Sequence, residues 1–151
     1  MSDTPKQQTL AGEIEFRGIG THSGADAKLV LKPAAAGTGR TFVRVDLEGQ
    51  PTIPATLDHV VATDLGTTLG VDEARVATVE HVLAALAAFE VDNVVLELDG
   101  PECPILDGSF REFVQGIVEV GVEEQDAPAE FIEVLGPVES GSKGQPSYVA
   151  M

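Results

Sequence analysis

Residues 78–100 read TVEHVLAALAAFEVDNVVLELDG and pass from one apolar pattern to another partway along. Up to Glu90 the apolar side chains recur every three or four residues, which predicts a helix that begins near Thr78. From Asp92 to Gly100 the residues predict a short strand that ends in a turn. A helix joined directly to a strand favours a mixed fold, and the flanking sequence decides which kind.

That flanking sequence predicts more strands than helices. Alternating apolar and polar residues, or β-branched residues between prolines, predict extended segments at residues 12–18, 27–33, 41–47 and 51–71. A second amphipathic helix is predicted from Ser109, with Gly121 as its stop. The predicted fold class is therefore α+β, with a mainly antiparallel sheet packed by two helices.

The C-terminal part of the chain differs in character from what precedes it. Residues 123–130 read EEQDAPAE, a polar stretch with proline that predicts a linker. Residues 130–139 and 146–151 predict two strands around a tight turn at residues 141–145. Because the last strand has no closing element after it, we interpret it as the cut arm of a hairpin rather than as a frayed terminus.

Composition excludes several classes of function. The chain has 151 residues, enough for one domain with a sizeable core, and 43% of them are apolar. Its formal net charge is −16, from 9 basic and 25 acidic residues, which argues against nucleic acid and against a membrane surface as partners. No apolar run is long enough to span a membrane, and the start lacks the apolar core of a signal peptide. A single cysteine, Cys103, allows no internal disulfide, so the predicted compartment is the cytoplasm.

The predicted helix carries an ionisable pair, Glu80 and His81, beside rather than within its apolar stripe. The stripe consists of Val79, Val82, Leu83, Leu86 and Phe89, and the side near the pair is otherwise Ala84, Ala85 and Ala88. A solvated face would normally carry long polar side chains. The alanines therefore predict that a ligand, a neighbouring domain or a partner chain covers this side.

The position of the pair on the helix also has chemical consequences. With Thr78 as the predicted N-cap, Glu80 and His81 lie in the first turn, where the helix dipole favours a charged carboxylate and a neutral imidazole. This combination suits a general base beside a metal ligand. The alternative is an ordinary first-turn glutamate and a partly buried surface histidine. The HExxH zinc motif is absent, because alanines occupy the places where its second histidine would fall.

Other motifs are less specific. GIGTHSG at residues 18–24 lacks the spacing and the following helix of a dinucleotide fingerprint, so it predicts either a plain glycine-rich connection or a close-approach loop with His22 reaching into a site. Gly66 and Gly70 mark a local turn or a close backbone approach. Asp107 or Ser109 is expected to cap the second helix. Cys103 and His59 are interpreted as structural.

Taken in their order along the chain, the stretches GIGTHSG, TTLG, TVEHVLAALAAFEVDNVVLEL and PECPILDGSFREFV resemble the UDP-3-O-acyl-N-acetylglucosamine deacetylases. The resemblance extends from about Gln8 to the C-terminus, and its TVEH and ILDGS motifs are specific to that family. These are zinc enzymes of the committed step of lipid A synthesis. The chain has Thr21 where the family usually has leucine before the loop histidine.

The resemblance implies a function and roles for named residues. The family hydrolyses the N-acetyl amide of a UDP-sugar that carries a 3-O-hydroxyacyl chain. By this resemblance His81 is a zinc ligand and Glu80 is the general base that takes a proton from the zinc-bound water. Leu65, Gly66 and Thr67 are expected to contact the substrate, and His22 lies in the matching glycine loop as a further substrate-binding candidate.

The resemblance also implies how the chain is organised. We expect a flexible tail at residues 1–7, an N-terminal deacetylase domain at 8–122, a linker at 123–129 and a truncated second domain from 130 to 151. In the family the second domain supplies the other zinc ligands, the general acid, the oxyanion-stabilising threonine and the acyl-chain passage. The fragment alone is therefore expected to be inactive and to bind zinc weakly. Two alternatives remain open, a non-catalytic binding or interaction module and a purely structural domain.

Overall fold

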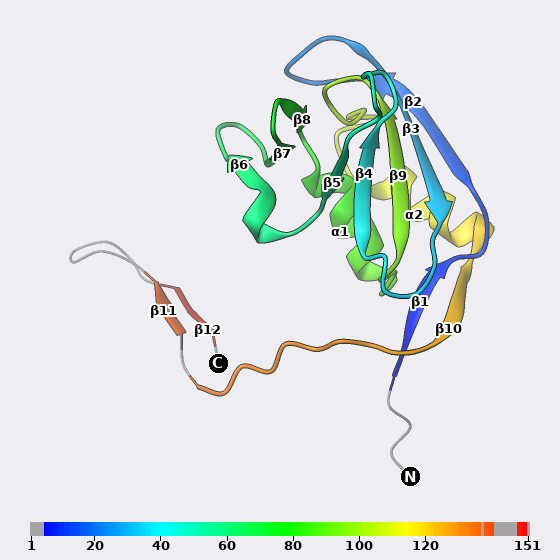
Figure 1. Ribbon diagram of the computed structural model, residues 1–151, viewed down its shortest axis with the longest axis vertical. Helices are drawn as coiled ribbons and strands as arrows, with labels where there is room; N and C mark the ends of the chain where they lie inside the picture. Colours follow the sequence, from blue (N-terminus) through cyan, green and yellow to red (C-terminus); the bar gives the residue numbers. More distant parts are fainter. Residues whose placement is uncertain (1–4, 137, 141–147, 151) are drawn as a thin grey trace.

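The computed structural model describes residues 5–136, 138–140 and 148–150, and a five-stranded sheet forms its centre (Figure 1). The strand order is β2-β3-β9-β4-β5. The bounds are Ile14–Ile19 for β2, Asp26–Pro33 for β3, Val94–Asp99 for β9, Arg40–Arg44 for β4 and Thr52–Pro54 for β5. Neighbouring strands are antiparallel except for β4 and β9, which run parallel. The predicted α+β class with a mainly antiparallel sheet is confirmed.

Two helices, α1 (Glu80–Ala88) and α2 (Arg111–Val120), lie against one face of this sheet (Figure 1). Alternate residues of the strands are buried beneath them, as the period of two in a strand requires. The rings of Phe16 on β2 and Phe113 on α2 meet edge to face, with centroids 4.8 Å apart. The largest fully buried apolar side chains of this core are Phe42, Phe113, Leu10, Leu29, Leu31, Ile53, Leu86, Leu96, Leu98 and Ile117.

Smaller sheets complete the described part of the chain. Strands β6 (Val60–Ala62), β7 (Thr68–Val71) and β8 (Ala74–Val76) form an antiparallel sheet beside β5, after a short 3-10 helix at Leu57–His59. Strand β1 (Lys6–Leu10) pairs with β10 (Val122–Pro128), and β11 (Val138–Ser140) pairs with β12 (Tyr148–Ala150). The last pair is the predicted hairpin, while its predicted turn at residues 141–145 lies outside the described residues.

Three local predictions differ from the structure. The stretch expected as a linker, residues 123–129, instead forms most of β10, because its backbone finds a partner in β1. Lys6 and Gln7 therefore belong to a strand and not to a flexible tail. Residues 131–136 are not a strand, and β11 begins only at Val138.

The end of α2 agrees with the prediction, whereas the start of α1 does not. Gly121 ends α2 with a positive φ of 82°, as predicted for a glycine stop. The first helical residue of α1 is Glu80 and not Thr78. Across the described residues, neither helix has the length and apolar character needed to cross a membrane.

Candidate active site

The start of α1 places Glu80 and His81 in its first turn, as predicted, but not through the predicted cap. The residue before the helix is Val79, which makes no side-chain capping hydrogen bond. Thr78 has a positive φ of 57°, a conformation that is rare for a β-branched residue. Its hydroxyl donates to the Glu102 carboxylate over 2.7 Å, so it is not the N-cap. Thr78 is therefore a sharp corner that directs the chain into α1.

The Glu80 carboxylate is held by the backbone of the segment that precedes β7. Its Oε2 accepts a hydrogen bond from the Thr67 N–H over 3.0 Å. A Cβ atom built on Gly66 would lie 3.1 Å from Glu80 Oε1, so the absence of a side chain at Gly66 leaves room for the carboxylate. Glu80 is half-buried. The predicted close backbone approach at Gly66 is thus an approach to the predicted base.

His22 contacts the same segment. Its Nε2 donates to the Leu65 carbonyl over 3.1 Å, and a carbonyl can only accept, so Nε2 carries a proton. The same Nε2 is 3.8 Å from the Cβ position of Gly66. The side chain of Leu65 itself is 87% exposed, and its φ is positive at 61°. Strained backbone of this kind is frequent at functional sites.

The structure thus gathers five of the six predicted site residues through direct contacts. Those five are His22, Leu65, Gly66, Thr67 and Glu80. His81, the predicted metal ligand, follows Glu80 on α1 and is half-buried. Within residues 5–136, no three His, Cys, Asp or Glu side chains are placed together to hold a metal ion. The described residues therefore form no complete set of metal ligands.

The alanine side of α1 is only partly as predicted. Ala84 and Ala88 are exposed, together with Ala87, which leaves a smooth surface on the helix. Ala85 is fully buried and belongs to the core. The exposed alanines lie along the helix that carries Glu80 and His81.

One residue of the site escaped the sequence analysis. Glu102, in the loop after β9, is 2% exposed, and its carboxylate accepts from the N–H groups of His22 and Ser23 at 3.1 and 2.7 Å as well as from the Thr78 hydroxyl. Burial acts to raise the pKa of Glu102, but the hydrogen bonds from Ser23, Thr78 and His22 outweigh it and lower the pKa to about 2. The only signal in the sequence is a lone acid in the apolar run PECPIL.

Four residues to which the sequence gives structural roles are not part of this site. Cys103 is buried, and its burial raises the pKa of the thiol, so it is no nucleophile. The ring of His59 lies 2.7 Å from the Thr56 hydroxyl through its Nδ1. At the start of α2, Ser109 Oγ accepts from the Arg111 N–H and donates to Asp107, while the residue at the N-cap position is Phe110.

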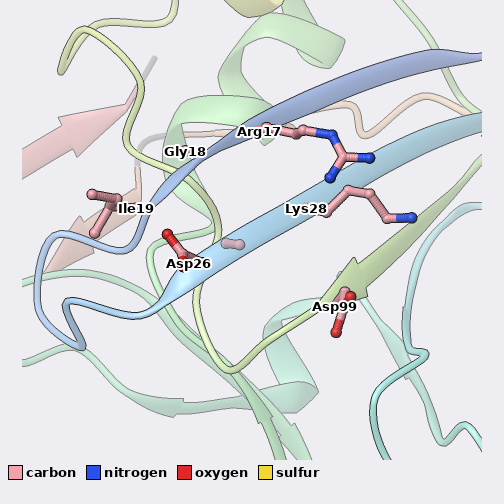
Figure 2. Close-up of a pocket in the computed structure, with 7 residues that line it drawn as sticks. Arg17, Gly18, Ile19, Asp26, Lys28 and Asp99 are labelled. Carbon is pink, nitrogen blue, oxygen red and sulfur yellow. The ribbon is translucent and has the colours of Figure 1, made fainter.

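A cavity of about 640 Å³ lies over strands β2, β3 and β9 and not at Glu80 (Figure 2). Arg17, Lys28 and Asp99 come from three neighbouring strands, and Ile19 and Asp26 lie toward the glycine loop. Two cations, Arg17 and Lys28, and two carboxylates, Asp26 and Asp99, line it, so it presents no surface of one charge. Neither Glu80 nor His81 lines it.

Comparison with known proteins adds an independent observation. The sequence model of the family described as UDP-3-O-acyl N-acetylglycosamine deacetylase (LpxC) matches residues 7–151. The chain is 52% identical to the UDP-3-O-acyl-N-acetylglucosamine deacetylase of Thermosynechococcus vestitus, over 87% of this chain and 46% of that protein. The enzyme of the same name from Myxococcus xanthus is 50% identical over 85% of this chain and 41% of its own length. A bifunctional enzyme LpxC/FabZ of Chlorobaculum tepidum is 44% identical over 88% of this chain and 28% of its own length. The chain spans less than half the length of these relatives.

Proposed function

This chain belongs to the UDP-3-O-acyl-N-acetylglucosamine deacetylase family, and we propose that it forms the base-bearing half of such an enzyme. The reaction is hydrolysis of the N-acetyl amide of a UDP-linked, 3-O-acylated N-acetylglucosamine, in lipid A synthesis. The observation that carries the proposal is the Glu80 carboxylate at the start of α1, which is held by the Thr67 N–H and lies beside Gly66, the residue that also neighbours the His22 ring.

In this proposal Glu80 is the general base. The Thr67 N–H occupies Oε2 and fixes the plane of the carboxylate, while Oε1 faces the open position at Gly66. The first turn of α1 places the carboxylate near the positive end of the helix dipole. A charged, oriented and half-exposed carboxylate can take a proton from a water molecule that attacks the amide.

His81 is the proposed zinc ligand. Its imidazole is a ligand type that Zn²⁺ prefers, and it follows the base directly in the first turn of α1. When bound, the ion would act as a Lewis acid on the amide carbonyl and on the attacking water. Because the described residues supply only one such ligand, the remaining ligands have to come from another part of the protein.

The surface around the base is the proposed substrate site. Leu65, Gly66 and Thr67 present backbone groups and one exposed apolar side chain beside Glu80, and the His22 ring stands opposite them. A UDP-sugar also needs cations for its phosphates. With a formal charge of −16, this chain offers few, so we expect the second domain to supply them.

The proposed domain organisation follows the same reasoning, with one change to its boundary. The first domain extends to Pro128, because β10 pairs with β1. Residues 130–151 then begin the second domain, with β11 and β12 as its first hairpin. The exposed alanines of α1 belong to the surface that faces this domain, and the whole protein acts in the cytoplasm.

Substitutions in the whole protein test the proposal. Glu80→Gln is expected to abolish deacetylation of the UDP-sugar while zinc content, measured by elemental analysis, is retained. His81→Ala is expected to lose both zinc and activity. His59→Ala, at a histidine bonded only to the neighbouring Thr56 hydroxyl, is the matched control and keeps both. Full activity in Glu80→Gln, or full zinc content in His81→Ala, would overturn the assignment.

A further inference from the structure

Glu102 is a buried carboxylate that the proposed chemistry does not use. All the groups that hydrogen-bond to it are neutral, namely the N–H groups of His22 and Ser23 and the hydroxyl of Thr78. Burying a charge is unfavourable unless hydrogen bonds compensate, and here each donor points at the same two oxygens. A side chain with only acceptor atoms is therefore required at this position.

The donors come from two segments that are far apart in the sequence. His22 and Ser23 belong to the glycine loop between β2 and β3, and Thr78 is the corner residue before α1. The loop comes close to the carboxylate because residue 20 is glycine, where a Cβ atom would lie only 2.4 Å from Glu102 Oε2. The backbone of Ala77 is in turn paired with residues 101–103, since Ala77 donates to Pro101 and accepts from Cys103.

These contacts form a closed circuit that includes the predicted base. Glu102 binds the backbone of His22, whose ring binds the Leu65 carbonyl. Thr67, two residues after Leu65, donates its N–H to Glu80. Glu80 in turn lies two residues after Thr78. Thr78 then returns to Glu102. The relative placement of the His22 ring and the Glu80 carboxylate thus depends on one anchor that touches neither the ring nor the carboxylate.

We propose that Glu102 is a positioning residue, which fixes the His22 loop and the Thr78 corner so that His22 and Glu80 face one substrate position. This inference rests on the proposed function for its kinetic consequence, but the geometry it describes does not. The low pKa of Glu102 keeps it charged, and hence purely an acceptor, throughout the neutral range. A glutamine would turn an N–H₂ group toward the donors and so break part of this circuit of hydrogen bonds.

The kinetic test uses the whole protein. Glu102→Gln is expected to lower kcat for deacetylation about ten- to a hundredfold, because small displacements of catalytic groups cost that much, while zinc content stays unchanged. Thr78→Val removes the hydroxyl donor and is expected to lower kcat as well, whereas Thr78→Ser keeps the donor and restores it. Asp92→Asn is the matched control, since Asp92 accepts a backbone N–H from Gln8 elsewhere in the domain.

A second measurement separates this inference from the proposed function. In the 151-residue chain, amide hydrogen exchange at His22 and Ser23 and the ring resonances of His22 are followed by NMR. Both are expected to change in Glu102→Gln and not in Asp92→Asn, whether or not the whole protein deacetylates the substrate. Unchanged exchange at both amides, or wild-type kcat in both Glu102→Gln and Thr78→Val, would overturn the positioning role. If Glu102→Gln does not fold, the Thr78→Val and Thr78→Ser pair decides.

Discussion

Gly66 lies between the two residues whose backbone binds the functional groups of the proposed site, Leu65 for His22 and Thr67 for Glu80. Its missing side chain leaves 3.1 Å between the Cβ position and Glu80 Oε1, and 3.8 Å to His22 Nε2. A methyl group at this position would have to displace the carboxylate by a few tenths of an ångström. Substitution at a single glycine therefore probes whether the site depends on this close approach.

We expect Gly66→Ala to lower kcat of the whole protein about tenfold, because the base is moved from its hydrogen bond with Thr67. Steady-state kinetics at saturating substrate measure this loss. Gly12→Ala is the matched control, since the nearest atom to its Cβ position is 3.9 Å away and its φ is not positive. Equal kcat values for the two variants would show that the close approach has no catalytic role.

The charge on the Glu102 carboxylate contributes to the stability of the fold. Its folded-state pKa of about 2 lies below the usual 4.5, so the charged form is favoured in the folded protein. The contribution to the free energy of unfolding is present above pH 4.5 and is lost as the pH falls toward 2. Such a shift corresponds to about 3 kcal/mol at neutral pH.

Glu102→Gln is therefore expected to be less stable than the parent chain at pH 7, with the difference shrinking as the pH falls from 4.5 to 2. Urea unfolding at several pH values measures the free energy of unfolding in each case. Glu112→Gln, at an exposed glutamate of α2, serves as the control and should follow the parent curve. A stability difference that is constant with pH would contradict the assignment.

Residues whose roles follow from a local pattern could be predicted from the sequence, and residues whose partners are distant could not. Glu80 and His81 stand out because the period of a single helix places them beside an apolar stripe. The prediction of Thr78 as the N-cap is wrong, because its hydroxyl binds Glu102, 24 residues later in the chain. Local patterns report local hydrogen bonds, and Glu102 makes only distant ones.

Strand β10 shows the same limit at the level of an element. Its residues are mostly exposed or half-exposed on both sides, so no alternation of apolar and polar residues marks it as a strand. Its backbone nevertheless pairs with β1, and Gln125 bonds to Asn93 and to the Ala34 carbonyl. The core strands could be predicted because burial imposes a period of two on them, whereas β10 depends on backbone pairing and on side-chain hydrogen bonds to residues far away in the sequence.

A chain that ends at Gly121 should consequently be less stable than one that ends at Ala129. The shorter chain loses the β1–β10 pairing and the Gln125 contacts, which at about 1 kcal/mol for each hydrogen bond amounts to several kcal/mol. Thermal unfolding followed by circular dichroism compares the two. Equal melting temperatures would support the earlier interpretation of residues 123–129 as a linker.

At the scale of the whole molecule, the described residues form one continuous core, and the proposed metal site lies at its surface with too few ligands of its own. The core is continuous from the sheet to both helices, yet His81 is the only proposed ligand. The relatives are more than twice as long as the matched region, which agrees with a site shared between two domains.

We therefore expect the 151-residue chain to fold, to bind Zn²⁺ weakly and to show no deacetylation. Isothermal titration with Zn²⁺ and an assay with the UDP-sugar measure the two properties. His81→Ala should abolish the weak binding, whereas His59→Ala should leave it unchanged. Deacetylation by this chain at the rate of the whole protein would refute the two-domain proposal.

The pairing of β1 with β10 has one more consequence. Lys6 and Pro128 are register partners, so everything from residue 6 to residue 128 departs from and returns to a single place. Because its two ends lie close together, such a unit can be inserted into a surface loop of an unrelated protein without stretching either polypeptide. We therefore expect a unit of this kind to be movable between proteins as one piece, with the pairing of its own strands unchanged.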